Sequence, residues 1–163
     1  MTLRMANAEL IPYNLNRYAD DLNLHFTNAT NKIKGYDQNF EGFNSSTAAI
    51  RSLEATSKML TTQLQSFLEE GGLSKKDQRA LNQQLIALEK SFLSEQGMYF
   101  GKWYKSLYAS SDPFSGYAAW ILPGLEYEIA LKSSDRLEEW DTRYAAAIGS
   151  LELKMKQLLQ DLE

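Results

Sequence analysis

Few residues in this sequence could do chemistry, and their spacing argues against a catalytic site. His25 is the only histidine, and the chain has no cysteine with which it could build a metal site. A catalytic serine would need a histidine base and a Gly-x-Ser-x-Gly turn, and the sequence has no such turn. We therefore interpret His25 as a structural or surface residue and expect neither a catalytic residue nor a metal ligand.

Carboxylate pairs could in principle serve as a general acid and base. They occur at Asp20–Asp21, Glu126 and Glu128, and Glu138–Glu139. Adjacent or alternate positions on a helix point in different directions, and no apolar pocket is implied that would raise the pKa of one partner. We interpret these carboxylates as parts of solvated helix faces.

The most unusual segment is a long aromatic-rich loop between two helical patterns. Residues 97–124 read GMYFGKWYKSLYASSDPFSGYAAWILPG. A connection of this length without helical periodicity is uncommon inside a compact domain, and such loops are usually functional. We therefore predict a functional loop at residues 97–122, closed by Pro123 at the first turn of a short helix that ends near Ser133.

Apolar residues at steps of three and four predict the helices that must position this loop. The first helix spans residues 15–33 with Asn14 as its cap, and the second carries its apolar stripe over residues 50–67. We expect the second helix to be entered through residues 44–46 and to stop at Gly71-Gly72.

Two further helices follow. The third begins with Ser74 and Asp77, which form a short variant of the capping box, and is expected to continue until Gly97. The last runs from Leu137 to Leu162 with an apolar stripe at steps of three and four. Valine is absent and no long segment alternates apolar and polar residues, so no sheet is predicted. The sequence predicts one all-α domain over residues 1–163, an up-down four-helix bundle whose neighbours pack antiparallel.

Composition excludes several classes of function. The chain has 163 residues, 17 basic and 21 acidic, and a net charge of -4, so no positive field attracts nucleic acid. There is no apolar run long enough to span a membrane and no pattern typical of an export signal. We expect neither nucleic-acid binding nor membrane insertion.

Two stretches resemble a known family. Residues 82–92 read NQQLIALEKSF, and the loop contains Tyr-Ala at 108–109 and Gly-Tyr-Ala at 116–118 before Leu-Pro-Gly. Residues 3–22 read LRMANAELIPYNLNRYADDL. Both stretches resemble the C-terminal helical dimerisation domain of the glutamate carboxypeptidase and transferrin receptor family of zinc peptidases. Residues 1–12 resemble the junction with the upstream protease domain.

The resemblance implies a non-catalytic role. In the family this domain forms much of a homodimer interface, and its loop reaches over the active site of the protease domain to contact the terminal residue of the peptide substrate. The two zinc ions belong to that protease domain, so no cofactor is implied for this chain. The implied partners are the chain's own protease domain, a second copy and, through the parent's active site, a peptide substrate. The resemblance also suggests an extracytoplasmic parent.

The resemblance implies two substrate-binding positions. Tyr117 matches the loop tyrosine that contacts the substrate's terminal carboxylate, whereas Gly116 stands where glutamate-specific members carry a lysine. Glycine supplies no positive charge, so a glutamate preference does not carry over. For Tyr117 we also consider a packing role, with the ring on the bundle and the hydroxyl in solvent.

The last helix and the loop contain the candidates for an interface. They are Trp140, Tyr144, Ile148, Leu151, Met155, Trp103 and Trp120. Periodicity alone allows the stripe of the last helix to face its own bundle, a two-fold partner, or both. An alternative function is a free-standing helical adaptor that uses this stripe to bind a partner helix.

Overall fold

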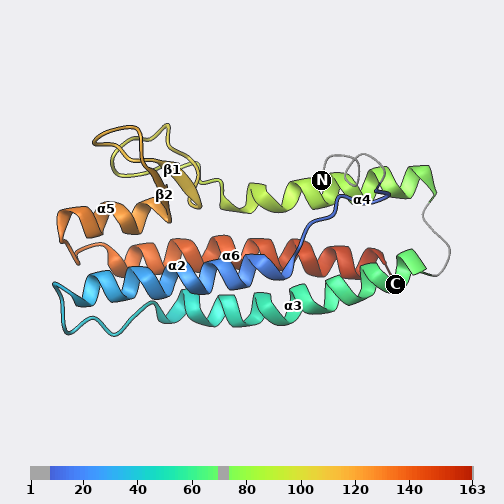
Figure 1. Ribbon diagram of the computed structural model, residues 1–163, viewed down its shortest axis with the longest axis horizontal. Helices are drawn as coiled ribbons and strands as arrows, with labels where there is room; N and C mark the ends of the chain where they lie inside the picture. The colour runs from blue at the N-terminus through green and yellow to red at the C-terminus, as the bar shows by residue number, and fades with distance from the viewer. Residues whose placement is uncertain (1–7, 70–73, 163) are drawn as a thin grey trace.

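The computed structural model describes residues 8–69 and 74–162, and over these ranges the chain is mostly helical (Figure 1). The elements in chain order are α2 (Asn16–Lys34), α3 (Asn44–Glu69), α4 (Lys75–Leu88), the 3-10 helix η1 (Glu89–Phe92), β1 (Ala109–Ser111), β2 (Ala119–Ile121), α5 (Pro123–Leu131) and α6 (Leu137–Asp161). The all-α prediction therefore holds for most of the chain, and the short hairpin β1–β2 is an addition to it. None of the described helices is long and apolar enough to cross a membrane.

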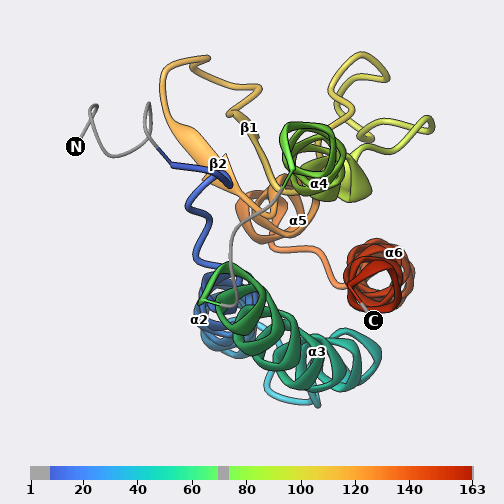
Figure 2. The same cartoon turned by 90° about the vertical axis from the view of Figure 1, so that its right-hand side faces the viewer.

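The four-helix up-down bundle is not confirmed. Helix α2 packs on α3, α3 packs along most of α6, and α4 packs on α6 (Figure 2). Helices α3 and α6 run in the same direction, because Asp141 contacts the start of α3 whereas Glu152, further along α6, contacts Ser52 and Thr56. The short connection between α3 and α4 led us to expect these two helices to be antiparallel neighbours. Instead, α4 packs antiparallel to α6, where Gln84 bonds Asp161 and Lys154 bonds the carbonyl of Ala87.

The start of α3 is capped from another helix. The carboxylate of Asp141 in α6 accepts hydrogen bonds from the backbone N–H groups of Ser45 at 2.9 Å and Ser46 at 2.8 Å. The Ser46 hydroxyl donates to the Asp141 carbonyl at 3.1 Å. These bonds satisfy N–H groups that have no partner within the helix, and they place a negative charge at the positive end of the helix dipole. The predicted entry through residues 44–46 is thus confirmed.

The other predicted helix ends are partly correct. Ser74 caps α4 by accepting the backbone N–H of Asp77 at 3.2 Å, as the capping-box pattern predicts. The Asn14 cap is wrong: the residue before α2 is Leu15, and it makes no side-chain capping bond. The third helix stops at Leu88 and tightens into η1, well before Gly97. The predicted stop at Gly71-Gly72 lies outside the described residues.

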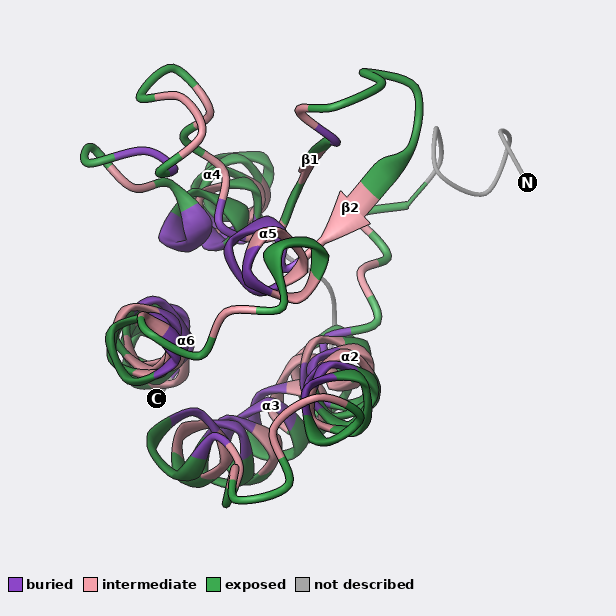
Figure 3. Ribbon diagram, turned by 90° about the vertical axis from the view of Figure 1, so that its left-hand side faces the viewer, coloured by how far each residue is buried: buried purple, intermediate pink, exposed green. Residues whose placement is uncertain are grey.

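The core is formed by one apolar stripe from each of α2, α3 and α6, together with buried side chains of α4, η1 and α5 (Figure 3). The largest buried side chains of α6 are Trp140 and Tyr144. Phe26 of α2 meets the Tyr144 ring edge-on with 5.6 Å between the centroids. Burial of these stripes is the main favourable contribution to folding, because most helical stability in a folded protein comes from packing an amphipathic face against its neighbours.

Candidate functional site

The loop at residues 97–122 is a folded structure rather than an irregular connection. Strands β1 and β2 pair antiparallel, with Ser110 opposite Trp120. The backbone continues this pairing on both sides: the N–H of Leu122 donates to the Tyr108 carbonyl, and the N–H of Asp112 donates to the Ala118 carbonyl, both at 2.8 Å. The three-residue strands are too short for sequence periodicity to detect, which explains why no sheet was predicted.

Asp112 holds the tip of this hairpin. Its carboxylate accepts the backbone N–H groups of Phe114 at 2.8 Å, Ser115 at 2.6 Å and Ala118 at 3.2 Å, and also the Ser115 hydroxyl. The side chain is only 5% exposed. These donors, the Ser115 hydroxyl foremost, lower the pKa of the Asp112 carboxyl to about 2. Our sequence reasoning overlooked Asp112, although the Asp-Pro-x-Ser sequence at residues 112–115 is a recognisable turn pattern.

The hairpin tip carries both predicted substrate-binding positions, Tyr117 and Gly116. The Tyr117 side chain is 97% exposed, and among the described residues neither its ring nor its hydroxyl has a partner. The packing role considered for Tyr117 is therefore wrong, since the ring does not lie on the bundle. Gly116 has a φ of +75°, in the left-handed region that favours glycine. The hydrogen bonds of Asp112 and the left-handed conformation of Gly116 thus fix the backbone of the turn, and the Tyr117 side chain points from this turn into solvent.

Beneath the tip, aromatic rings pack the loop against α5. Phe100 lies 5.2 Å from Tyr127 of α5 and 6.1 Å from Trp120 of β2, measured between ring centroids. Phe114 stacks on Tyr127 at 6.1 Å with an interplanar angle of 16°. The full cluster, here called the loop aromatic cluster, comprises Phe100, Trp103, Tyr104, Phe114, Trp120 and Tyr127. Such ring pairs stabilise the loop beyond the area they bury, so the loop does not depend on the main core alone.

The end of the loop contacts α6 through the predicted turn at Pro123 and Gly124. Pro123 occupies the first turn of α5. The N–H of Gly124 donates to the Tyr144 hydroxyl at 3.2 Å, and a Cβ at position 124 would lie 2.6 Å from the Trp140 ring. Only glycine permits this close contact between α5 and α6.

A buried ion pair joins the same two helices. Glu128 of α5 is fully buried, and its Oε1 atom accepts from the Arg136 guanidinium at 2.7 Å and from the Trp140 indole N–H at 3.3 Å. Its Oε2 atom has no hydrogen-bond partner among the described residues. The interpretation of Glu128 as part of a solvated helix face is therefore wrong. The spacing of Glu126 and Glu128 in the sequence did not reveal that the turn between α5 and α6 brings Arg136 back to Glu128.

Two arginine side chains connect the beginning of the loop to α6. Arg143 donates to the Gly97 carbonyl at 2.6 Å and to the Ser94 hydroxyl at 3.2 Å, while its guanidinium lies over the Trp140 ring. Arg136 lies over the Tyr99 ring at 4.5 Å. Sequence reasoning missed both contacts. Together they fix the loop to the same part of α6 as Gly124 and Glu128.

The predicted interface residues divide into two groups. The five residues of α6, Trp140, Tyr144, Ile148, Leu151 and Met155, have no exposed surface, because the stripe packs entirely against the chain's own helices. They are therefore unavailable to a partner, which corrects the expectation that this stripe is shared with a second copy. Trp103 is 80% exposed and Trp120 is half-buried in the loop aromatic cluster. An interface role stays a prediction for these two.

His25 lies half-buried on α2. Its ring meets the Tyr108 ring edge-on, with 6.5 Å between the centroids. Within the described ranges, no three His, Cys, Asp or Glu side chains gather closely enough to hold a metal ion.

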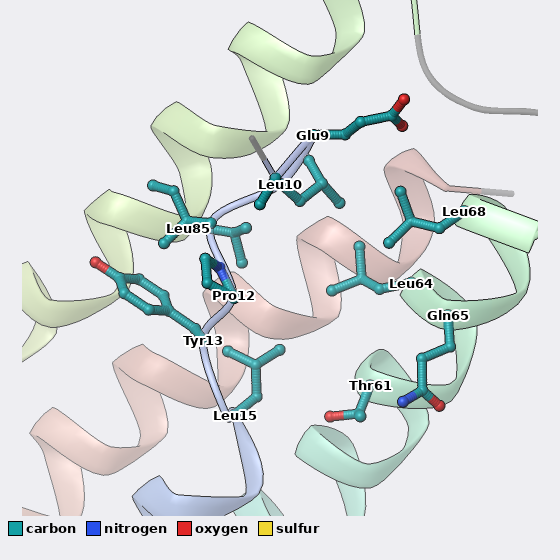
Figure 4. Close-up of a pocket in the computed structure, with 12 residues that line it drawn as sticks. Glu9, Leu10, Pro12, Tyr13, Leu15, Thr61, Leu64, Gln65, Leu68 and Leu85 are labelled. Atoms are coloured by element: carbon teal, nitrogen blue, oxygen red, sulfur yellow. The ribbon is translucent and has the colours of Figure 1, made fainter. Parts of the chain in front are cut away.

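Two hollows flank the segment that precedes α2. The first, with a volume of about 680 Å³, lies between Leu10 and Pro12 of that segment, Leu64 and Leu68 of α3, and Leu85 of α4 (Figure 4). The end of α3, which contributes to this lining, lies at the opposite end of the molecule from the hairpin β1–β2 (Figure 1). None of the residues that line this hollow belongs to the loop, so the hollow is not part of the loop site.

The second hollow, of about 970 Å³, lies beside the base of the loop and is lined by Tyr13, Tyr18 and Tyr108 among others. Burial, and then the nearby Glu89 carboxylate, raise the pKa of Tyr18 to about 12, so its hydroxyl stays protonated at neutral pH. The hydroxyl can therefore act as a hydrogen-bond donor but not as a base.

The described part of the predicted junction, residues 8–12, lies against α4. Asn82 accepts the backbone N–H of Ile11 at 2.7 Å and donates to the Glu9 carbonyl at 3.1 Å. Asn82 is the first residue of one of the two stretches that carry the family resemblance, and Glu9 and Ile11 belong to the other. The structure thus brings the two stretches into contact, although residues 1–7 lie outside the described ranges.

Comparison with known proteins identifies one family. The family model of the transferrin receptor-like dimerisation domain matches residues 24–156, which include α3, α4, the loop, α5 and most of α2 and α6. No curated protein matches the chain.

Proposed function

Because the chain belongs to the family of transferrin receptor-like dimerisation domains, we propose that it serves a zinc-dependent, glutamate carboxypeptidase-like peptidase as its non-catalytic dimerisation and substrate-loop domain. The parent's protease domain would hold the two zinc ions and perform the hydrolysis. This chain would contribute the contact to a second copy and a loop that reaches the substrate.

The observation that carries the substrate-loop role is the presentation of Tyr117. Its side chain is exposed at the tip of a hairpin that is otherwise tied down by Asp112, by the loop aromatic cluster and by Arg143. Because the backbone that carries Tyr117 is already fixed, a ligand that binds this side chain does not have to order the loop. A fully solvated tyrosine on a rigid loop fits a group that contacts something outside this chain.

The dimerisation role is supported by the family match and by exposed apolar surface. Trp103 lies on the loop with most of its indole in solvent, and Phe114 and Tyr99 are also exposed. Large exposed aromatic side chains are typical of surfaces that meet another protein. The alternative adaptor function loses its proposed surface, because the α6 stripe is buried.

The substrate-loop role is tested with Tyr117→Phe in the full-length protein. The change removes the hydroxyl donor and keeps the ring, so kcat/KM should fall by the value of one hydrogen bond to a charged group, about 10- to 150-fold (roughly 1.5 to 3 kcal/mol). Tyr104→Phe is the matched control: it makes the same chemical change in the same loop, on a half-buried tyrosine. If Tyr117→Phe stays within about twofold of the parent on every peptide, the loop does not contact substrate through this hydroxyl.

A further inference from the structure

We propose that the substrate residue contacted by this loop carries an uncharged, apolar side chain, an inference that rests on the proposed substrate-loop function. Three features of the loop support this inference: the charges of its hairpin half, the side chains that its tip exposes, and the backbone conformation at the position preceding Tyr117.

The hairpin half of the loop, residues 106–122, offers no free charge to a substrate; the two lysines of the loop, Lys102 and Lys105, lie in its first half, where Lys105 pairs with Glu95. Residues 106–122 contain one charged residue, Asp112. Both of its carboxylate oxygens accept hydrogen bonds from the loop itself, Oδ1 from the backbone at Phe114 and Ser115 and Oδ2 from the Ser115 hydroxyl and the Ala118 backbone. An acidic substrate side chain would find no cation there, and a basic one would find no available carboxylate. A charged group brought against such a surface loses hydration without gaining a partner.

The surface that the tip does expose is aromatic. Phe114 is 65% exposed and Tyr117 almost fully exposed, only three residues apart in the turn. One side of Phe114 is held by Tyr127 and by Trp120, whose centroid lies 5.9 Å away, so the ring is fixed and its other side is open. A fixed aromatic face in the same turn as an exposed phenol suits a substrate residue whose side chain is apolar and whose carboxylate accepts the hydroxyl's hydrogen bond.

The backbone also disfavours a cation at the tip. Gly116 has a φ of +75°, which a lysine adopts only with strain, although among the described residues no atom beyond the two neighbouring residues would lie within 4 Å of an added Cβ. The space is open but the conformation favours glycine. Position 116 therefore supplies a turn rather than a charge.

The test measures kcat/KM of the full-length protein on four matched peptides that end in Leu, Phe, Gln and Glu. Because an unpaired charge is costly at an uncharged surface, we expect the Leu and Phe peptides to exceed the Glu peptide by about 10- to 100-fold. Gln has the size of Glu without its charge, so it should lie above Glu. A Glu peptide cleaved as well as the Leu and Phe peptides would overturn the inference.

Variants separate this inference from the proposed function. Phe114→Ala should lower kcat/KM for the Leu and Phe peptides and leave the Glu peptide nearly unchanged. Gly116→Lys should improve the Glu peptide relative to Leu, and Gly116→Ala is its control, because it introduces the same backbone strain without the charge. If Tyr117→Phe lowers activity but Glu is the preferred residue, only the apolar specificity fails. If Tyr117→Phe and Phe114→Ala change no peptide, the substrate-loop function and the specificity fail together.

Discussion

Removing the guanidinium of Arg136 should destabilise the fold strongly, because it leaves a buried carboxylate without its counter-ion. Glu128 is fully buried, its Oε1 atom lies 2.7 Å from the Arg136 Nε atom, and its Oε2 atom has no partner among the described residues. In Arg136→Met the Trp140 indole at 3.3 Å is the one donor to the Glu128 side chain that remains within the described ranges. One long neutral donor does not replace an ion pair.

The magnitude follows from burial. Removing one partner of a buried ion pair costs about 3 to 5 kcal/mol. The Arg136 side chain is 31% exposed, so water can partly solvate the site and the lower end, about 3 kcal/mol, is expected. For a chain of this size that loss corresponds to a fall in Tm of about 6 to 12 °C.

Urea unfolding followed by circular dichroism measures this loss, with two controls. Arg17→Met breaks the exposed Arg17–Asp21 pair, whose side chains are 68% and 31% exposed, and should cost less than about 0.5 kcal/mol. Adding Glu128→Gln to Arg136→Met removes the buried charge itself and should recover part of the lost stability. If Arg136→Met is no more destabilised than Arg17→Met, the buried pair does not hold α5 on α6 as we argue.

Three further predictions concern the packing of α5 on α6, the ionisation of Asp112 and the zinc affinity of the chain. Gly124→Ala places a methyl group 2.6 Å from the Trp140 ring, so α5 and α6 must separate; we expect a loss of about 1 to 3 kcal/mol in urea unfolding. The pKa of Asp112 is lowered from 3.8 to about 2, so its ionised form stabilises the folded loop above pH 3.8, and this stabilisation is lost as the pH falls through 2. Amide resonances of Phe114, Ser115 and Ala118 should therefore keep their neutral-pH shifts at pH 3.8 and move only near pH 2, whereas in Asp112→Ala they should already differ at neutral pH. Calorimetric titration of the isolated chain with zinc should show no micromolar, stoichiometric site, and a site that disappears in His25→Ala would contradict our interpretation of that histidine.

The parts of the fold that depend on local periodicity were predictable. The stripes of α2, α3 and α6 follow from apolar residues three and four apart, and the start of α4 follows from Ser74 and Asp77, because these patterns act within one helix. The pairing of the helices was not predictable, since it depends on contacts between distant residues. Asp141, for example, is an ordinary acidic residue in the sequence of α6, and only the tertiary structure places it at the start of α3.

The candidate site, too, was predictable only in part. Tyr117 and Gly116 could be identified from the family resemblance, and the structure places both at an exposed hairpin tip. The residues that support this tip escaped detection. Glu128 lies in a pattern that resembles a solvated helix face, and its burial depends on how Arg136 and Trp140 fold back onto it. Buried polar networks of this kind arise from tertiary packing and leave little periodic signal.

Dimerisation is the central claim, and the molar mass of the purified chain in solution tests it most directly. Light scattering after gel filtration, across a dilution series that reaches high micromolar concentration, should give twice the chain mass of 18.6 kDa. Trp103→Ala should shift the chain toward the monomer without changing its helical circular dichroism, because this side chain is 80% exposed and outside the core. A mass of one chain at every concentration would contradict the proposal that this domain itself carries the dimer contact.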